Sequence, residues 1–124
     1  MSSVLLIDDS ATSRAVLKVY LSGKSYELYE AADGEAGLNL ARQRRPSVIL
    51  LDLKMPGMDG LTFCRSLRSD PLLRLVPVIL ISGTKSVQLA QEAVRIGARH
   101  YLTKPINYDV LLSLVEKCIA EVKR

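Results

Sequence analysis

Two apolar runs near the middle of the chain constrain its fold more than any other feature. Ser47–Leu51 has the sequence SVILL and Pro77–Ile81 has the sequence PVILI, and neither run alternates apolar with polar residues. A strand with one face in water alternates, whereas a strand in a parallel sheet is covered by helices on both faces and stays apolar throughout. These runs therefore predict two central strands of a parallel sheet in an α/β domain.

The rest of the chain predicts strands and helices in alternation around these two runs. Further strands are expected at Val4–Ile7, Tyr26–Ala31 and Arg99–Leu102. Capping residues predict three helices: Ala11–Leu21 with Ser10 as N-cap and Gly23 beyond its end, a helix from the N-cap Asp33 to about Arg44, and a helix from the N-cap Asp59 to about Arg68. A fourth helix is expected at about Ser86–Ile96. The last helix begins near Asn107, and its apolar spacing forms a stripe that docks on the sheet, made of Leu111, Val115, Cys118, Ile119 and Val122. Joined by right-handed crossovers, these elements predict a doubly wound, flavodoxin-like α/β fold with strand order 2-1-3-4-5 and five helices.

Composition limits the class of protein. The 124 residues suit a single domain, 1–124, and no apolar run approaches the roughly 20 residues of a membrane span. The start lacks a signal peptide, so we expect a cytoplasmic location with no membrane contact. Cys64 and Cys118 are expected to be reduced core residues, and a single histidine, His100, argues against a zinc site. The net charge is +4, but the densest basic cluster, Arg42–Arg45, is interpreted as a solvated helix end and not as a nucleic-acid site.

The predicted strand order brings polar residues from four strands to one edge of the sheet. Ligands of such folds bind outside the carboxyl ends of the strands. The residues that follow the first, third, fourth and fifth strands are Asp8 and Asp9, Asp52, Ser82-Gly83-Thr84, and Thr103-Lys104-Pro105. Three carboxylates in one crevice repel each other and require a cation, and ligands that are all oxygens suit Mg²⁺. The sequence therefore predicts a magnesium site at this edge.

The same residues favour phosphoryl acceptance on Asp52. An aspartate can act as a nucleophile and form an aspartyl phosphate, while Lys104 and the metal balance the charge on the phosphoryl oxygens. Ser82 would donate a hydrogen bond to such an oxygen, and Gly83 has no side chain to block access. Taken singly, each residue also has an ordinary structural interpretation, such as a helix cap for Ser82 or a surface lysine for Lys104.

Four motifs, in order along the chain, resemble the receiver domain of two-component response regulators. They are Asp8-Asp9, Asp52–Gly60 with the sequence DLKMPGMDG, Ser82, and Lys104-Pro105. The resemblance covers essentially the whole chain, and the ordered set is specific although each motif alone is weak. It implies a signalling switch in which Asp52 accepts a phosphoryl group from a sensor histidine kinase or a phosphotransfer protein. It implies that the domain removes its own phosphoryl group by autodephosphorylation and turns over no external substrate.

The resemblance also implies how the metal is bound. Asp9 would bind Mg²⁺ directly, and Asp8 would assist through water or hydrogen bonds. Asp52 and the backbone carbonyl of Lys54 would complete the protein ligands.

Further residues would relay the change in charge. Ser82 would be the switch hydroxyl, Lys104 would pair with the phosphoryl group, and the bond from Lys104 to Pro105 would be cis. Tyr101 would be the switch aromatic that turns inward on activation. The output surface for a downstream protein or domain would be the fourth helix, the fifth strand and the last helix, with candidate residues Gln88, Gln91 and Arg95.

Two other classes of protein fit this sequence less well. A haloacid dehalogenase-like phosphohydrolase needs a second aspartate two residues after the nucleophile, where this chain has Lys54, and it needs a cap domain. A flavin-binding module needs a phosphate loop rich in hydroxyl groups and glycine, where Asp8-Asp9 would repel a phosphate. The sequence leaves open whether the receiver stands alone or begins a longer regulator, and whether it forms a homodimer.

Overall fold

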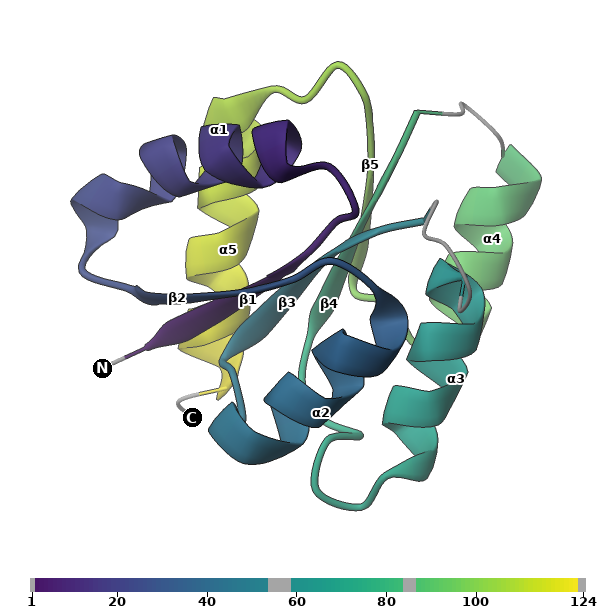
Figure 1. Ribbon diagram of the computed structural model, residues 1–124. Coiled ribbons are helices and arrows are strands. Elements are labelled where there is room, and N and C mark those ends of the chain that lie inside the picture. The colour runs from purple at the N-terminus through teal and green to yellow at the C-terminus, as the bar shows by residue number, and fades with distance from the viewer. Residues whose placement is uncertain (1, 54–58, 84–86, 123–124) are drawn as a thin grey trace.

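The computed structural model describes residues 2–53, 59–83 and 87–122, which form one parallel sheet covered by helices on both faces (Figure 1). The strand order is β2-β1-β3-β4-β5, as the sequence predicted. The elements in chain order are β1 (Ser3–Ile7), α1 (Ala11–Leu21), the 3₁₀ turn η1 (Ser22–Lys24), β2 (Glu27–Ala31), α2 (Gly34–Arg44), β3 (Val48–Asp52), α3 (Gly60–Ser69), β4 (Val78–Ser82), α4 (Val87–Arg95), β5 (His100–Thr103) and α5 (Tyr108–Val122).

Burial along the strands follows their position in the sheet. Every residue of β1, β3 and β4 is buried, whereas the edge strands β2 and β5 are partly exposed. The SVILL and PVILI runs thus lie in two central strands, covered by helices on both faces, which is why they show no polar alternation.

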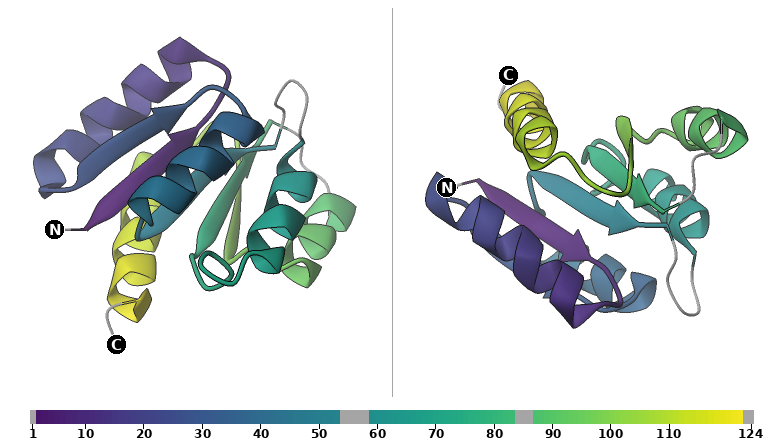
Figure 2. Two further views of the ribbon diagram at one scale, coloured as in Figure 1. Left: turned by 60° about the horizontal axis from the view of Figure 1, so that its bottom comes forward. Right: turned by 90° about the horizontal axis from the view of Figure 1, so that it is seen from above.

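Each face of the sheet has its own apolar core. Figures 1 and 2 show α2 and α5 on opposite faces. On one face, α2, α3 and α4 contribute Leu38, Ala41, Phe63, Cys64, Leu67 and Ala93. On the other face, α1 and α5 contribute Leu17, Leu21, Leu111, Val115, Cys118 and Ile119. The predicted stripe of the last helix therefore docks on the sheet, except that the side chain of Val122 lies outside the described residues.

The predicted helix starts are confirmed by their caps. The side chain of Ser10 accepts a hydrogen bond from the amide of Ser13, that of Asp33 from Ala36, and that of Asp59 from Thr62, at 2.8–3.1 Å. The predicted start of the fourth helix at Ser86 lies outside the described residues. Gly23 lies beyond α1 as expected, but within a 3₁₀ turn that the sequence did not predict.

Strand ends differ from the prediction by one residue at the edge that matters most. β3 includes Asp52 and β4 includes Ser82, whereas the predicted strands ended at the preceding apolar residue. The register pairs Asp52 with Ile81 and Ser82 with Thr103. The ladder is formed by backbone groups, so a polar side chain does not end it. Both residues are consequently held by the sheet itself.

The two cysteines are free and buried, as predicted. Burial raises the pKa of the Cys64 thiol to about 11. No helix within the described part of the chain is long and apolar enough to cross a membrane.

An arginine on α3 ties two loops together at the amino edge of the sheet. The guanidinium of Arg68 donates hydrogen bonds to the carbonyl oxygens of Arg74, Val76 and Gly97. Gly97 follows α4 with a φ of +98°, and a Cβ atom added there would lie 2.4 Å from the Nε atom of Arg68. Both the backbone conformation and the close approach therefore require glycine.

Candidate functional site

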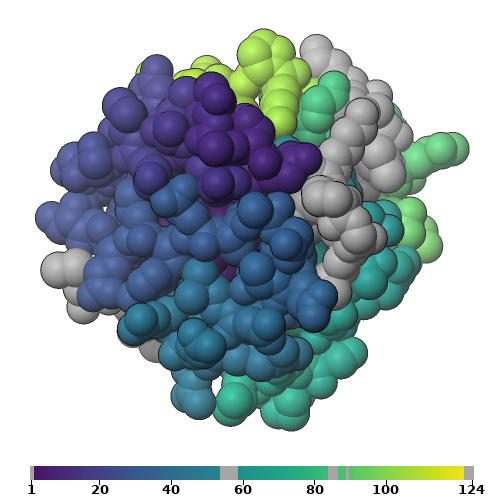
Figure 3. Space-filling view, in the orientation of Figure 1, coloured from purple at the N-terminus to yellow at the C-terminus, as the bar shows by residue number. Residues whose placement is uncertain are grey.

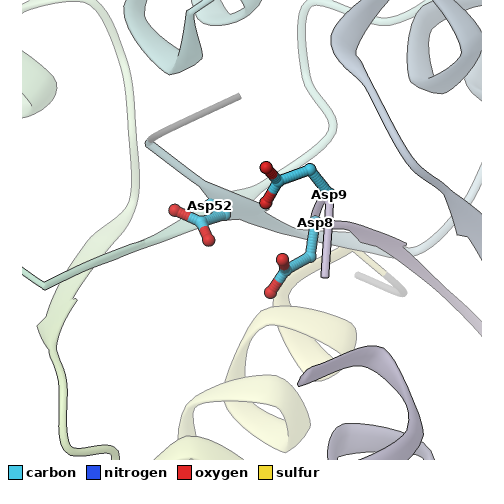
Figure 4. A group of neighbouring side chains, drawn as sticks. All are labelled: Asp8, Asp9 and Asp52. Carbon is cyan, nitrogen blue, oxygen red and sulfur yellow. The ribbon is translucent and has the colours of Figure 1, made fainter. Parts of the chain in front are cut away.

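Three carboxylates meet at the carboxyl edge of the sheet. Asp8 and Asp9 follow β1 and Asp52 ends β3, and these two strands are neighbours. One carboxylate oxygen from each residue lies within 4.8 Å of the others (Figure 4). Asp8 and Asp52 are buried, at 5% and 7% exposure, while Asp9 is exposed. The sequence-predicted acidic residues are thus brought together, with one open side toward solvent.

Local hydrogen bonds fix Asp8 in this cluster. Its amide donates to the carbonyl of Ala31 at 3.1 Å, and its Oδ1 atom accepts from the amide of Ser10 at 2.8 Å. Burial raises the pKa of Asp8, and the negative charges of Asp52 and Asp9 raise it further. The cluster therefore favours any ligand that brings positive charge.

The donor set fits a magnesium ion. Carboxylate oxygens are hard ligands, and Mg²⁺ binds through one or two carboxylates while keeping several waters. One exposed and two buried carboxylates leave room for such water on the solvent side. The carbonyl of Lys54, which the resemblance adds to the ligands, lies outside the described residues.

Lys104 brings a positive charge against this cluster. Its Nζ atom lies 3.2 Å from Oδ2 of Asp52, and its backbone amide donates to the carbonyl of Ser82 at 2.7 Å. The Lys104–Pro105 peptide bond is cis. Ser82, at 2% exposure, ends β4 beside these residues. The lysine, the serine and the acceptor candidate therefore come from three adjacent strand ends.

The other predicted residues lie less directly at the site. Gly83 is exposed, and a Cβ atom added to it would meet no described atom within 4 Å, so packing does not require glycine there. Thr84 lies outside the described residues. Tyr101 is in the interior of β5, opposite Leu80, where it is half-buried against the core beneath α2, α3 and α4.

A groove of about 310 Å³ adjoins the acidic cluster and was not predicted. It runs between α1 and the segment that joins β5 to α5, which lie side by side in Figure 3. Its walls are Asp8, Ser10, Thr12, Ser13, Val16, Leu17, Ile81, Lys104, Pro105, Ile106 and Tyr108. Tyr20 of α1 stacks on Tyr108, with ring centroids 3.9 Å apart, and so links α1 to the start of α5.

Sequence reasoning also missed Arg14, whose guanidinium contacts the backbone of Asp8. The only signal in the sequence is its position one turn into the helix that follows the acidic pair, and that position does not show which way the side chain turns.

Fold and site together define a doubly wound parallel α/β domain with a lysine-paired acidic site at the carboxyl edge of its sheet.

Comparison with known proteins identifies the family. The family model of the response regulator receiver domain matches residues 4–116. The chain belongs to this family, whose role is that of a phosphorylation-activated switch in two-component signalling.

Two relatives show how the domain is used in chains of different length. Response regulator PleD of Caulobacter vibrioides is 40% identical over 109 residues, which are 88% of this chain and 24% of PleD. The chain thus spans about a quarter of that relative. Protein PilH of Pseudomonas aeruginosa is 34% identical over 120 residues, which are 97% of this chain and 99% of PilH.

Solved structures share the architecture. The chemotaxis protein CheY4 of Vibrio cholerae has a TM-score of 0.88 and 32% identity, with 95% of this chain and 98% of that chain covered. The signal receiver domain of a signal transduction histidine kinase from Syntrophus aciditrophicus has a TM-score of 0.91 and 32% identity, with 100% and 94% covered. The predicted flavodoxin-like fold is thereby confirmed.

Proposed function

We propose that Asp52 is the residue of this receiver that accepts the phosphoryl group, and that Asp8, Asp9 and Asp52 hold Mg²⁺ for the transfer. The observation that carries the proposal is the contact of Lys104 with Asp52 inside a cluster of three carboxylates. A structural ion pair does not need two further carboxylates beside it, whereas carboxylates in that position can hold the metal ion that a phosphoryl-transfer site uses.

Each group then has a chemical task. When bound, Mg²⁺ would supply positive charge that offsets the negative charge on the phosphoryl oxygens and would help to orient them for in-line attack. A carboxylate oxygen of Asp52 attacks phosphorus, and the new P–O bond forms as the P–N bond to the donor's histidine breaks. Lys104 pairs with a phosphoryl oxygen and Ser82 donates a hydrogen bond to another. Attack of water later restores the carboxylate and releases inorganic phosphate.

The relay through Ser82 and Tyr101 is supported by strand geometry. Ser82 is two residues after Leu80, and side chains two apart on a strand share a face of the sheet. Tyr101 lies opposite Leu80 and packs against the same core. A movement of Ser82 toward the phosphoryl group therefore changes the space next to this ring, which couples the charge change to β5 and the adjoining helices.

The proposal includes the setting of the switch. The donor is a sensor histidine kinase or a phosphotransfer protein, and the output surface for a downstream partner is formed by α4, β5 and α5. Gln88, Gln91 and Arg95 are exposed on α4 and available to such a partner. We place the domain in the cytoplasm as one receiver, 1–124. It binds no nucleic acid directly and turns over no external substrate.

Phosphorylation of a matched pair of variants tests the acceptor. Wild type, Asp52→Asn and Asp109→Asn are incubated with Mg²⁺ and phosphoramidate, a small donor with a P–N bond, and followed by intact mass. Asp109 is an exposed residue in the first turn of α5 and serves as the control. Wild type and Asp109→Asn should gain one phosphoryl group, and Asp52→Asn none.

Two results would contradict the proposal. One is equal phosphorylation of Asp52→Asn at the same site. The other is sustained hydrolysis of an unrelated phosphate ester such as p-nitrophenyl phosphate, which would make the chain a turnover enzyme.

A further inference from the structure

The peptide that joins Asp8 to Asp9 is held by an arginine from α1. Asp8 is the first residue after β1, so its carbonyl lies beyond the paired residues of that strand. The Nη1 atom of Arg14 donates to this carbonyl oxygen at 2.5 Å. Together with the bonds of the Asp8 amide to Ala31 and of the Asp8 carboxylate to Ser10, this contact fixes the residue at three points.

Arg14 is itself anchored by a carboxylate on β2. Its Nε atom lies 3.0 Å from Oε1 of Glu30, and the Nζ atom of Lys18 lies 2.8 Å from Oε2 of the same residue. The Arg14 side chain is 16% exposed, against 42% for Lys18. Hydrogen bonds from Lys18 and Arg14 hold the pKa of Glu30 below its usual value, so this anchor is ionised at neutral pH.

The planarity of the peptide carries this restraint to the next residue. The carbonyl of Asp8 and the amide of Asp9 lie in one plane, so a fixed carbonyl direction also fixes the amide of Asp9 and limits where its Cβ atom points. Asp9 is the exposed member of the cluster and has the least packing to hold its carboxylate. The guanidinium fork suits this task because it binds two acceptors in a fixed geometry.

We propose that Arg14, anchored by Glu30, is a positioning residue that orients the Asp8–Asp9 peptide and so directs the Asp9 carboxylate into the cation site. The inference rests on the proposed function, in which Asp9 is a ligand of Mg²⁺. Residues that orient metal ligands change affinity by about 10–100-fold when removed.

Lys18 provides the matched control. Arg14→Gln and Lys18→Gln each remove one positive charge and one ion pair with Glu30, but only the first removes the contact with Asp8. The Mg²⁺ dissociation constant of the unphosphorylated 124-residue chain is measured by amide NMR titration. The ¹⁵N order parameter of the Asp9 amide is measured in the metal-free proteins, and thermal unfolding is recorded for each.

The expected result separates the two variants. Arg14→Gln should weaken Mg²⁺ binding by about tenfold or more, and Lys18→Gln by less than about twofold. In the metal-free proteins the Asp9 order parameter should fall from about 0.85 toward about 0.6 in Arg14→Gln only. The melting temperatures of the two variants should lie within about 4 °C of each other, because each loses one ion pair with Glu30 and Arg14→Gln loses in addition one hydrogen bond to the Asp8 carbonyl.

Equal weakening by both variants would overturn the inference, because charge and not position would then be the cause. An unchanged Asp9 order parameter in Arg14→Gln would also overturn it. A wild-type protein that binds no Mg²⁺ would instead refute the proposed metal site, and a selective loss of order at Asp9 would still support the positioning role.

Discussion

Asp8→Asn should stabilise the protein in the absence of metal, because the acidic cluster stores repulsion. The substituted amide keeps an oxygen that can accept the hydrogen bond of the Ser10 amide, so the local backbone is preserved. The change removes one of three charges whose oxygens lie within 4.8 Å.

The size of the effect follows from these distances. One like-charge contact at 4.8 Å costs about 3.5 kcal/mol at an effective dielectric constant of about 20. Lys104 lies against Asp52 and offsets part of this repulsion, and water reaches the exposed side of the cluster. We therefore expect a net gain of about 1–2 kcal/mol in the free energy of unfolding. For a domain of this size the melting temperature should rise by about 4–8 °C.

The effect has a defined dependence on pH. Burial, then the charge of Asp52, raises the pKa of Asp8 above its ordinary value of 3.8. The folded state therefore binds the Asp8 proton more tightly than the unfolded state does. The stability that this proton contributes is fully present below the ordinary pKa and is lost as the pH rises through the raised pKa. The asparagine does not titrate, so its advantage over wild type is complete above the raised pKa of Asp8 and disappears in acid.

Thermal and urea unfolding at several pH values, with and without Mg²⁺, give the comparison. Mg²⁺ should stabilise wild type more than Asp8→Asn, because the variant offers the ion less negative charge. An Asp8→Asn protein that is less stable than wild type without metal would show that the cluster stores no net repulsion. Equal stabilisation of both proteins by Mg²⁺ would show the same.

Three further predictions follow from other contacts. Lys104→Ala removes the ion pair with Asp52, and it should leave phosphorylation by phosphoramidate detectable by mass while abolishing the NMR shifts of Tyr101 that phosphorylation causes in wild type. Gly97→Ala should lower the free energy of unfolding in urea by about 1–3 kcal/mol, because its φ of +98° is strained for alanine and the added Cβ meets Arg68; an unchanged midpoint would contradict this. Burial raises the pKa of the Cys64 thiol to about 11, so little reactive thiolate forms at neutral pH in the folded protein. Cys64 should therefore react with a disulfide reagent only as fast as the protein unfolds.

The fold was predictable because the strongest signals are local. The runs at Ser47–Leu51 and Pro77–Ile81 are apolar throughout, and capping residues mark three helix starts. Strand ends were less predictable, since apolar patterning ends before Asp52 and Ser82 while backbone pairing continues through them.

The acidic cluster was predictable because strand order places Asp8, Asp9 and Asp52 at one edge. The contacts of Arg14 were not predictable, because they depend on how α1 is rotated and on Glu30, which lies 16 residues away on β2. Contacts of this kind arise from tertiary packing and leave no periodic pattern in the sequence.

Titration with Mg²⁺ and beryllofluoride, a mimic of the phosphoryl group, followed by amide NMR, tests most directly whether Asp52 accepts the phosphoryl group. We expect saturable shifts that begin at Asp9, Asp52, Ser82 and Lys104 and extend to Tyr101 and α5. The Asp52→Asn variant should show none of the beryllofluoride shifts. Absence of binding in wild type, or equal shifts in Asp52→Asn, would contradict the assignment of Asp52 as the phosphoryl acceptor of a working switch.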